Sequence, residues 1–209
     1  MPPIPDRNLE QRIVNAALRL CRARGEKGLT LRAVARAAGT TTPTVYKRFR
    51  NKEALRIALA RHVRQELLDE VFASSRLEEV YRRYLRFGED RPKEYGLMAA
   101  VWSEVFSAEE AQRPGEVWFR ERLAERFGGS PEEYTRAYYA FLLLCHGTAS
   151  VINMAPDKSV RERLRENCIA IGDALMQNVN ILRPAAPGRS NERAAGSTPE
   201  KFVAETTSR

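Results

Sequence analysis

Hydroxyl and cationic side chains are concentrated between residues 41 and 52, and this mixture has the chemistry of a nucleic-acid contact surface. The donors of this run are Thr41, Thr42, Thr44, Tyr46, Lys47, Arg48 and Lys52. Hydroxyl and cationic groups hydrogen-bond to phosphates and base edges, and the threonine methyl groups suit contact with thymine. A solvated surface helix is the alternative interpretation of the same residues.

Residues for other kinds of chemistry are scarce. Cys145 and His146 are adjacent, and neighbours on a helix point about 100° apart, so they cannot share a proton directly. The chain has two histidines and three cysteines, and the cysteine positions match no metal-ligand spacing. We find no glycine-rich phosphate loop and no nucleophile elbow. We therefore expect no enzyme, no metal and no cofactor. Redox sensing by Cys145 or Cys168 is a weaker alternative, because buried cysteines are usually inert.

The charge of the chain is distributed unevenly. Its 209 residues carry a net charge of +8. Residues 1–66 hold 15 Lys and Arg against 5 Asp and Glu, whereas residues 67–209 hold 20 against 22. Such a basic block favours a polyanion as partner. The sequence also begins without an apolar signal segment, so we expect a soluble cytoplasmic protein.

The elements that must position these residues are helices. Apolar residues recur with helical spacing nearly everywhere, and no stretch alternates as a strand does. We expect an all-α fold with about nine helices. Their approximate ranges are 7–24, 31–38, 41–49, a long helix from 52, 77–90, 92–107, 114–127, 131–154 and 158–182. The uncharged run 137–155 contains polar residues and predicts a buried helix, not a membrane span. Residues 183–209 lack an apolar stripe, and we expect a disordered tail there.

Residues 31–49 have the layout of a helix-turn-helix, in which the second helix enters the major groove of DNA. Thr30 is a good cap for the first helix, and Gly39 suits the turn. Pro43 fits the first turn of the second helix. Val45 and Phe49 recur at helical spacing and should pack inward.

The segment TLRAVARAAGTTTPTVYKRFRNKEAL resembles the DNA-binding signature of the TetR family of bacterial transcriptional regulators. The matching residues are Thr30, Ala38-Gly39, the run from Val45 to Phe49, and Lys52-Glu53. Two positions depart from the family pattern. Arg48 replaces the usual histidine, which adds a phosphate contact, and Pro43 stands where a small residue is common.

This resemblance implies an N-terminal arm (1–6), a DNA-binding domain (7–66) and a ligand-binding, dimerising domain (67–182), followed by the tail (183–209). The DNA contacts expected are Thr30, Arg32, Thr41, Thr42, Pro43, Thr44, Tyr46, Lys47, Arg48 and Lys52. Tyr46 and Lys52 should hold phosphates, while Thr42, Pro43 and Lys47 should lie nearest the base edges.

The C-terminal two thirds resembles the family mainly in layout. Residues 139–152, YAFLLLCHGTASVI, are similar to a His-Gly motif of one family subgroup. We expect an apolar or aromatic ligand among the middle helices, bound by Trp102, Phe106, Trp118, Tyr138, Phe141 and His146. We expect a dimer face formed by Leu164, Cys168, Ile171, Gly172, Leu175 and Val179, with ordinary core packing as the alternative.

Together these features predict a homodimeric, one-component regulator, most simply a repressor, that binds a palindromic double-stranded operator and responds to a small-molecule effector. The alternative is an all-α enzyme or interaction module that uses a basic helix-turn-helix as scaffold. The sequence leaves open the effector, the operator, and whether the ligand releases or promotes DNA binding.

Overall fold

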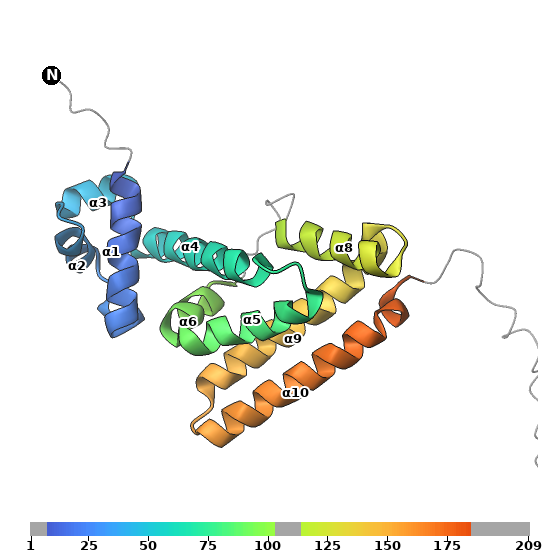
Figure 1. Ribbon diagram of the computed structural model, residues 1–209. Helices are drawn as coiled ribbons and strands as arrows, with labels where there is room; N and C mark the ends of the chain where they lie inside the picture. The colour runs from blue at the N-terminus through green and yellow to red at the C-terminus, as the bar shows by residue number, and fades with distance from the viewer. Residues whose placement is uncertain (1–7, 103–113, 185–209) are drawn as a thin grey trace, which may run out of the picture.

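The computed structural model describes residues 8–102 and 114–184, and in these residues the chain is helical without a strand (Figure 1). The α-helices are α1 (Leu9–Arg24), α2 (Leu31–Ala37), α3 (Thr42–Arg48), α4 (Lys52–Phe72), α5 (Leu77–Asp90), α6 (Pro92–Ala100), α8 (Pro114–Phe127), α9 (Thr135–Met154) and α10 (Lys158–Gln177). Three short 3₁₀ turns, η1 (Glu26–Gly28), η2 (Pro131–Tyr134) and η3 (Val179–Leu182), complete the elements. The predicted all-α class is confirmed.

Side-chain caps explain where four of these helices begin. Thr30, Thr41, Asn51 and Asp157 each accept a hydrogen bond from the backbone N–H three residues later, at 3.2, 3.3, 2.8 and 2.8 Å. Each cap satisfies one of the backbone donors that the first turn of a helix leaves without a partner. The capping role predicted for Thr30 is confirmed.

The helices form two packed groups joined by α4 (Figure 1). Helices α1, α2 and α3, with the start of α4, form one group that we call the head. Its interior contains Ile13, Cys21, Val34 and Val45, all fully buried. Phe49 is also buried, so Val45 and Phe49 pack inward as predicted.

Helices α5, α6, α8, α9 and α10 form the second group, which we call the body (Figure 1). Helices α9 and α10 run side by side beneath α5, and α8 covers one end. The body core is aromatic, with Tyr81, Phe87, Tyr95 and Phe119 all buried. None of the helices in the described ranges has an apolar stretch long enough to cross a membrane.

The C-terminal boundaries differ from those predicted. The expected helix 131–154 is the turn η2 followed by α9, and the expected helix 158–182 is α10 followed by η3. Helix α6 ends at Ala100, and residues 103–107 of the expected helix 92–107 lie outside the described residues.

The predicted tail starts too early at Arg183. Its Nε donates to a Glu133 carboxylate oxygen at 2.7 Å, and its guanidinium lies 5.5 Å from the centre of the Tyr134 ring. These two contacts pack Arg183 against η2. Residues 185–209 of the predicted tail lie outside the described residues.

Candidate nucleic-acid interface

Helix α3 presents two different faces. Val45 and Phe49 lie in the core of the head, whereas Tyr46, Lys47 and Arg48 are exposed, with Tyr46 exposing 52% of its surface. The turn before α3 contains Gly39 at φ 64°, a left-handed conformation that few other residues adopt without strain. Thr40 N donates to Ala35 O across this turn at 2.9 Å. The helix-turn-helix is therefore present, with a polar face of its second helix open to solvent.

The three threonines of α3 have different roles. Thr41 caps the helix, and its Oγ1 lies 2.8 Å from Thr44 Oγ1, so these two hydroxyls bond to each other. Thr42 takes part neither in the cap nor in this bond between hydroxyls. Thr30 is likewise engaged in capping α2. Capping explains the hydroxyl residues at Thr30 and Thr41, and the bond to Thr41 explains the hydroxyl of Thr44.

Cations surround this face without carboxylate partners. Within the described part of the chain, all six exposed cations between Thr30 and Lys52 form no ion pair: Arg32, Arg36, Lys47, Arg48, Arg50 and Lys52. They lie on α2, on α3 and the residues that follow it, and on the first residue of α4. Such a group of unpaired positive charges attracts a polyanion.

Comparisons with known proteins agree with this geometry. A family model described as "Bacterial regulatory proteins, tetR family" matches residues 13–59, which span α1, α2, α3 and the first turns of α4. Residues 13–59 of the chain therefore match the DNA-binding domain of the TetR family. With this domain the chain is a DNA-binding transcriptional regulator. No curated protein matches it at a significant level.

Solved structures share its fold over most of their length. A tetR-family transcriptional regulator from Streptomyces coelicolor is 18% identical, with a TM-score of 0.59 over 81% of this chain and 83% of that chain. A TetR transcriptional regulator from Rhodococcus sp. RHA1 is 22% identical, with a TM-score of 0.55 over 82% and 97%. The Thermus thermophilus repressor FadR, solved in complex with lauroyl-CoA, is 21% identical, with a TM-score of 0.53 over 87% and 100%.

The body of this chain contains a small apolar cavity of about 50 Å³. Its lining comes from α4, α5, α8 and α9: Leu68, Val71, Phe72, Val80, Tyr84, Phe119, Tyr138, Phe141, Leu142 and Cys145. Of the predicted ligand residues, Tyr138 and Phe141 line this cavity. Sequence reasoning missed the contributions of α4 and α5, because their apolar residues show only ordinary core periodicity.

The other predicted ligand residues lie elsewhere. Trp118 packs against Phe72, with ring centres 4.7 Å apart, in a separate open groove between α4 and α8. Trp102 stacks on His146 with ring centres 4.0 Å apart. Phe106 lies outside the described residues. The structure therefore does not bring the predicted set together around one cavity.

A polar cluster adjoins the cavity. His146 Nδ1 lies 2.8 Å from the Tyr95 hydroxyl and 3.3 Å from that of Tyr84, and Tyr84 itself lines the cavity. Burial lowers the pKa of His146 and raises the pKa of Tyr95 to about 12. Burial also raises the pKa of Tyr84. All three groups are therefore held neutral, which suits an uncharged hydrogen-bonding ligand group.

Half of the predicted dimer residues face the interior of the subunit. Cys168, Gly172 and Val179 are buried. A Cβ added at Gly172 would lie 3.1 Å from the Tyr81 ring, so this glycine permits close packing of α5 within the chain. The dimer role predicted for these three residues is wrong, because residues buried inside one subunit cannot contact a second one. Leu164 and Leu175 are half-buried, and Ile171 is 49% exposed.

A larger apolar surface was missed. The structure exposes seven large hydrophobic side chains in the described ranges, and six of them lie on α9, α10 and η3: Tyr139, Leu143, Val151, Met154, Ile171 and Ile181. We call these six residues the apolar face. The seventh, Tyr46, lies on α3. The uninterrupted apolar run Leu142–Leu144 could have indicated this surface. A helix with apolar side chains all around it is normally buried all around, so the side that faces away from its own subunit needs a partner.

Proposed function

We propose that this regulator is a cytoplasmic, ligand-responsive repressor that binds a palindromic operator as a homodimer. The observation that carries the DNA-binding part is the group of unpaired cations around the exposed face of α3. In a helix-turn-helix this face enters the major groove.

The contacts that α3 would make in the major groove follow from which of its side chains are exposed and which hydroxyls are already bonded within the protein. Pro43 and Lys47 are exposed on the outer side of α3, and Thr42 has a hydroxyl outside the Thr41–Thr44 pair. These three side chains would meet base edges. Tyr46 and Lys52 flank them and would hold phosphates on either side.

The apolar face supports a homodimer. Contiguous exposed apolar patches mark interaction sites, and two copies of α9 and α10 would bury such a patch against each other. A two-fold dimer would then place its two heads on half-sites about 34–36 Å apart, or a multiple of this spacing.

The cavity supports a response to a small molecule. Pockets that hold drug-sized ligands measure roughly 300–1,000 Å³, far more than the 50 Å³ found between α4, α5, α8 and α9. A ligand of that size must push these helices apart. Its affinity would therefore differ between the two arrangements of the body, which is the requirement for a ligand-driven switch.

A salt titration on random-sequence duplex DNA tests the DNA-binding part. We expect the logarithm of the association constant to fall linearly with the logarithm of the salt concentration, because counterions are released on binding. The slope should correspond to several phosphate contacts. Binding too weak to measure at low salt would overturn the proposal and favour the enzyme or interaction module that uses the head as scaffold.

The homodimer is tested by light scattering on Leu143→Glu, which places a charge in the apolar face where the native side chain is 67% exposed. We expect a dimeric wild type and a monomeric variant. Tyr46→Glu is the matched control, since it places the same charge at the exposed hydrophobic residue outside this face and should remain dimeric. A monomeric wild type at micromolar concentration would contradict the proposal.

A further inference from the structure

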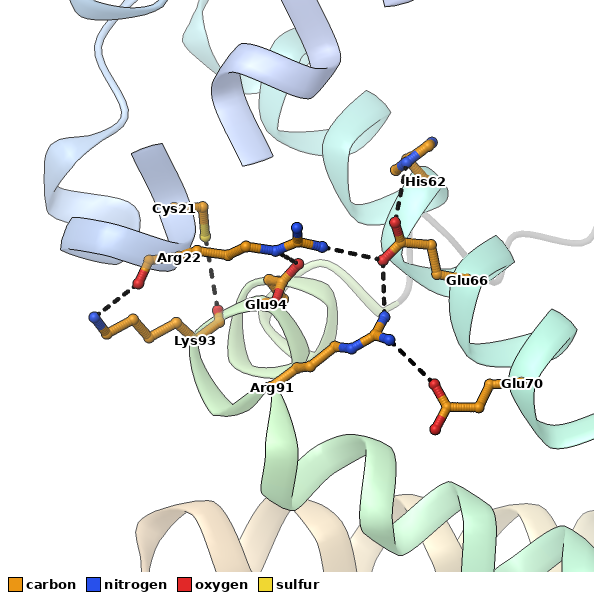
Figure 2. A network of polar contacts seen from close by, with 8 residues as sticks. All are labelled: Cys21, Arg22, His62, Glu66, Glu70, Arg91, Lys93 and Glu94. Atoms are coloured by element: carbon orange, nitrogen blue, oxygen red, sulfur yellow. Dashed lines mark hydrogen bonds and ion pairs between the residues drawn. The ribbon is translucent and has the colours of Figure 1, made fainter. Parts of the chain in front are cut away.

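The first turn of α6 meets the last turn of α1 through a buried charge (Figure 2). Glu94 is 3% exposed, and it is the one charged residue buried in the described ranges. Its Oε1 accepts a hydrogen bond from Arg22 Nε at 2.7 Å. The Arg22 side chain is half exposed, so this contact joins a surface residue of the head to an interior residue of the body.

Lys93 strengthens the same junction. Its Nζ donates to the carbonyl oxygens of Arg22 and Ala23 at 2.9 and 3.0 Å. These carbonyls belong to the last turn of α1, where helical partners are missing. Cys21 Sγ also lies 3.9 Å from Lys93 O. Two successive residues of α6 therefore bind the C-terminal end of α1.

Helix α4 is joined to the same turn. Glu66 Oε2 lies 3.6 Å from Arg22 Nη2 and 3.0 Å from Arg91 Nη1, and Arg91 also reaches Glu70 at 3.2 Å. Figure 2 shows these side chains pointing toward one another from α1, α4 and the start of α6. At the other end of α6, Arg56 of α4 donates to Ala100 O at 3.3 Å.

The next residue of α6 faces the opposite side. Tyr95 is fully buried in the body, and its hydroxyl lies 2.8 Å from His146 Nδ1 and 3.5 Å from the Tyr84 hydroxyl. Tyr84 lines the cavity. One helical turn therefore contacts the head through Glu94 and the wall of the cavity through Tyr95.

We propose that Glu94, paired with Arg22, is a positioning residue that holds the head in its DNA-binding orientation. The proposal rests on the proposed DNA-binding function. A buried carboxylate without its partner is strongly unfavourable, so orientations of the head that separate Arg22 from Glu94 are sparsely populated.

The test compares Arg22→Gln and Glu94→Leu, which change the net charge in opposite directions. Long-range electrostatics alone would weaken DNA binding in the first variant and tighten it in the second. Loss of a positioning contact weakens both. We expect about a tenfold weaker affinity in each, within the usual range of coupling between sites, measured by fluorescence anisotropy on a duplex that the wild type selects from a random library.

The control is Glu78→Leu, which gives the same charge change as Glu94→Leu. It breaks the Arg126–Glu78 pair between α8 and α5, away from the head. We expect its affinity to equal that of the wild type. The double variant Arg22→Gln/Glu94→Leu removes both partners together. Its loss of DNA affinity should equal the loss in either single variant.

Two results would overturn the proposal. In the first, Glu94→Leu binds DNA as tightly as Glu78→Leu. In the second, the fold loss of DNA affinity in the double variant equals the product of the fold losses in the two single variants. If Arg22→Gln does not fold, as judged by thermal unfolding, the double variant decides the question, since it leaves no unpaired buried carboxylate behind. A wild type that binds no duplex would instead contradict the proposed function itself.

Discussion

Ion pairs are frequent among the cations of the body and absent, within the described residues, from those between Thr30 and Lys52. In the body, Arg82 pairs with Asp173 at 3.1 Å, Arg165 with Glu89 at 3.6 Å, and Arg126 with Glu78. On the outer side of the head, Lys47 and Lys52 form no ion pair with any described residue, and the other exposed cations of α2 and α3 do not either.

The head itself divides in the same way. Arg22 and Arg56 face the body and are paired, with Glu94 at 2.7 Å and Glu26 at 3.2 Å. Exposed ion pairs contribute little to stability, so pairing is not needed to hold a surface together. An unpaired group of like charges nevertheless repels itself. The difference indicates that the outer side of the head is built for a partner that supplies the anions.

Reversing charge on the outer side of the head is the strongest way to test this difference. We expect Lys47→Glu/Arg48→Glu to weaken DNA binding by roughly a hundredfold or more, because two attractive contacts become repulsive near phosphates. The same change in the body, Lys158→Glu/Arg161→Glu, should alter affinity by less than about twofold. Equal losses in both variants, measured by anisotropy at one salt concentration, would show that total charge and not its location governs binding.

Thr42 tests whether base readout comes from the one α3 threonine outside the capping pair. We expect Thr42→Ala to lose about 1–3 kcal/mol of discrimination at a single base position, with other positions unchanged. Thr42→Ser keeps the hydroxyl and loses the methyl group, so the pair of variants separates hydrogen bonding from thymine contact. The measurement is selection from a random duplex library. An unchanged preference in Thr42→Ala would place base recognition on other residues.

Lys52 should contribute a phosphate contact without sequence preference. We expect Lys52→Ala to weaken binding to all duplexes alike and to reduce the salt slope by about 1. Lys158→Ala, which removes an exposed cation of α10 that pairs with Glu162 at 3.4 Å, should leave the slope unchanged. A slope that is the same in wild type and Lys52→Ala would contradict the proposed docking of the head.

Local features of this fold are predictable from the sequence, because they depend on neighbours within a few residues. The caps Thr30 and Asn51 and the left-handed Gly39 each act over one turn of chain. The inward positions of Val45 and Phe49 follow from helical periodicity.

Features that depend on which helices meet were not predictable. Glu94 and Arg22 are 72 residues apart. The sequence alone does not distinguish a buried glutamate such as Glu94 from one exposed to solvent. Gly172 suggests close helix approach, but the sequence does not say whether the neighbour is Tyr81 or a second subunit. Likewise Trp102 and Trp118 were grouped by residue type, whereas the structure places them in different surroundings.

The smallest expected effect concerns the neutral cluster of the body, which contrasts with the charged surface of the head. Burial lowers the pKa of His146 in the folded chain below its value in the unfolded chain, about 6.5. Below that pH the unfolded chain binds the extra proton, so the stability contributed by the neutral histidine is present above pH 6.5 and lost as the pH falls toward the folded value. We expect the wild type to lose stability over this interval and His146→Gln to lose less, by urea unfolding at pH 7.5 and 5.5. His62→Gln is the control, because His62 lies on α4 beside Glu66 and outside the cluster. If His146→Gln and the wild type show the same pH dependence while both unfold in one transition, then His146 is not held neutral by the body, and the cluster beside the cavity contains a group that can carry charge.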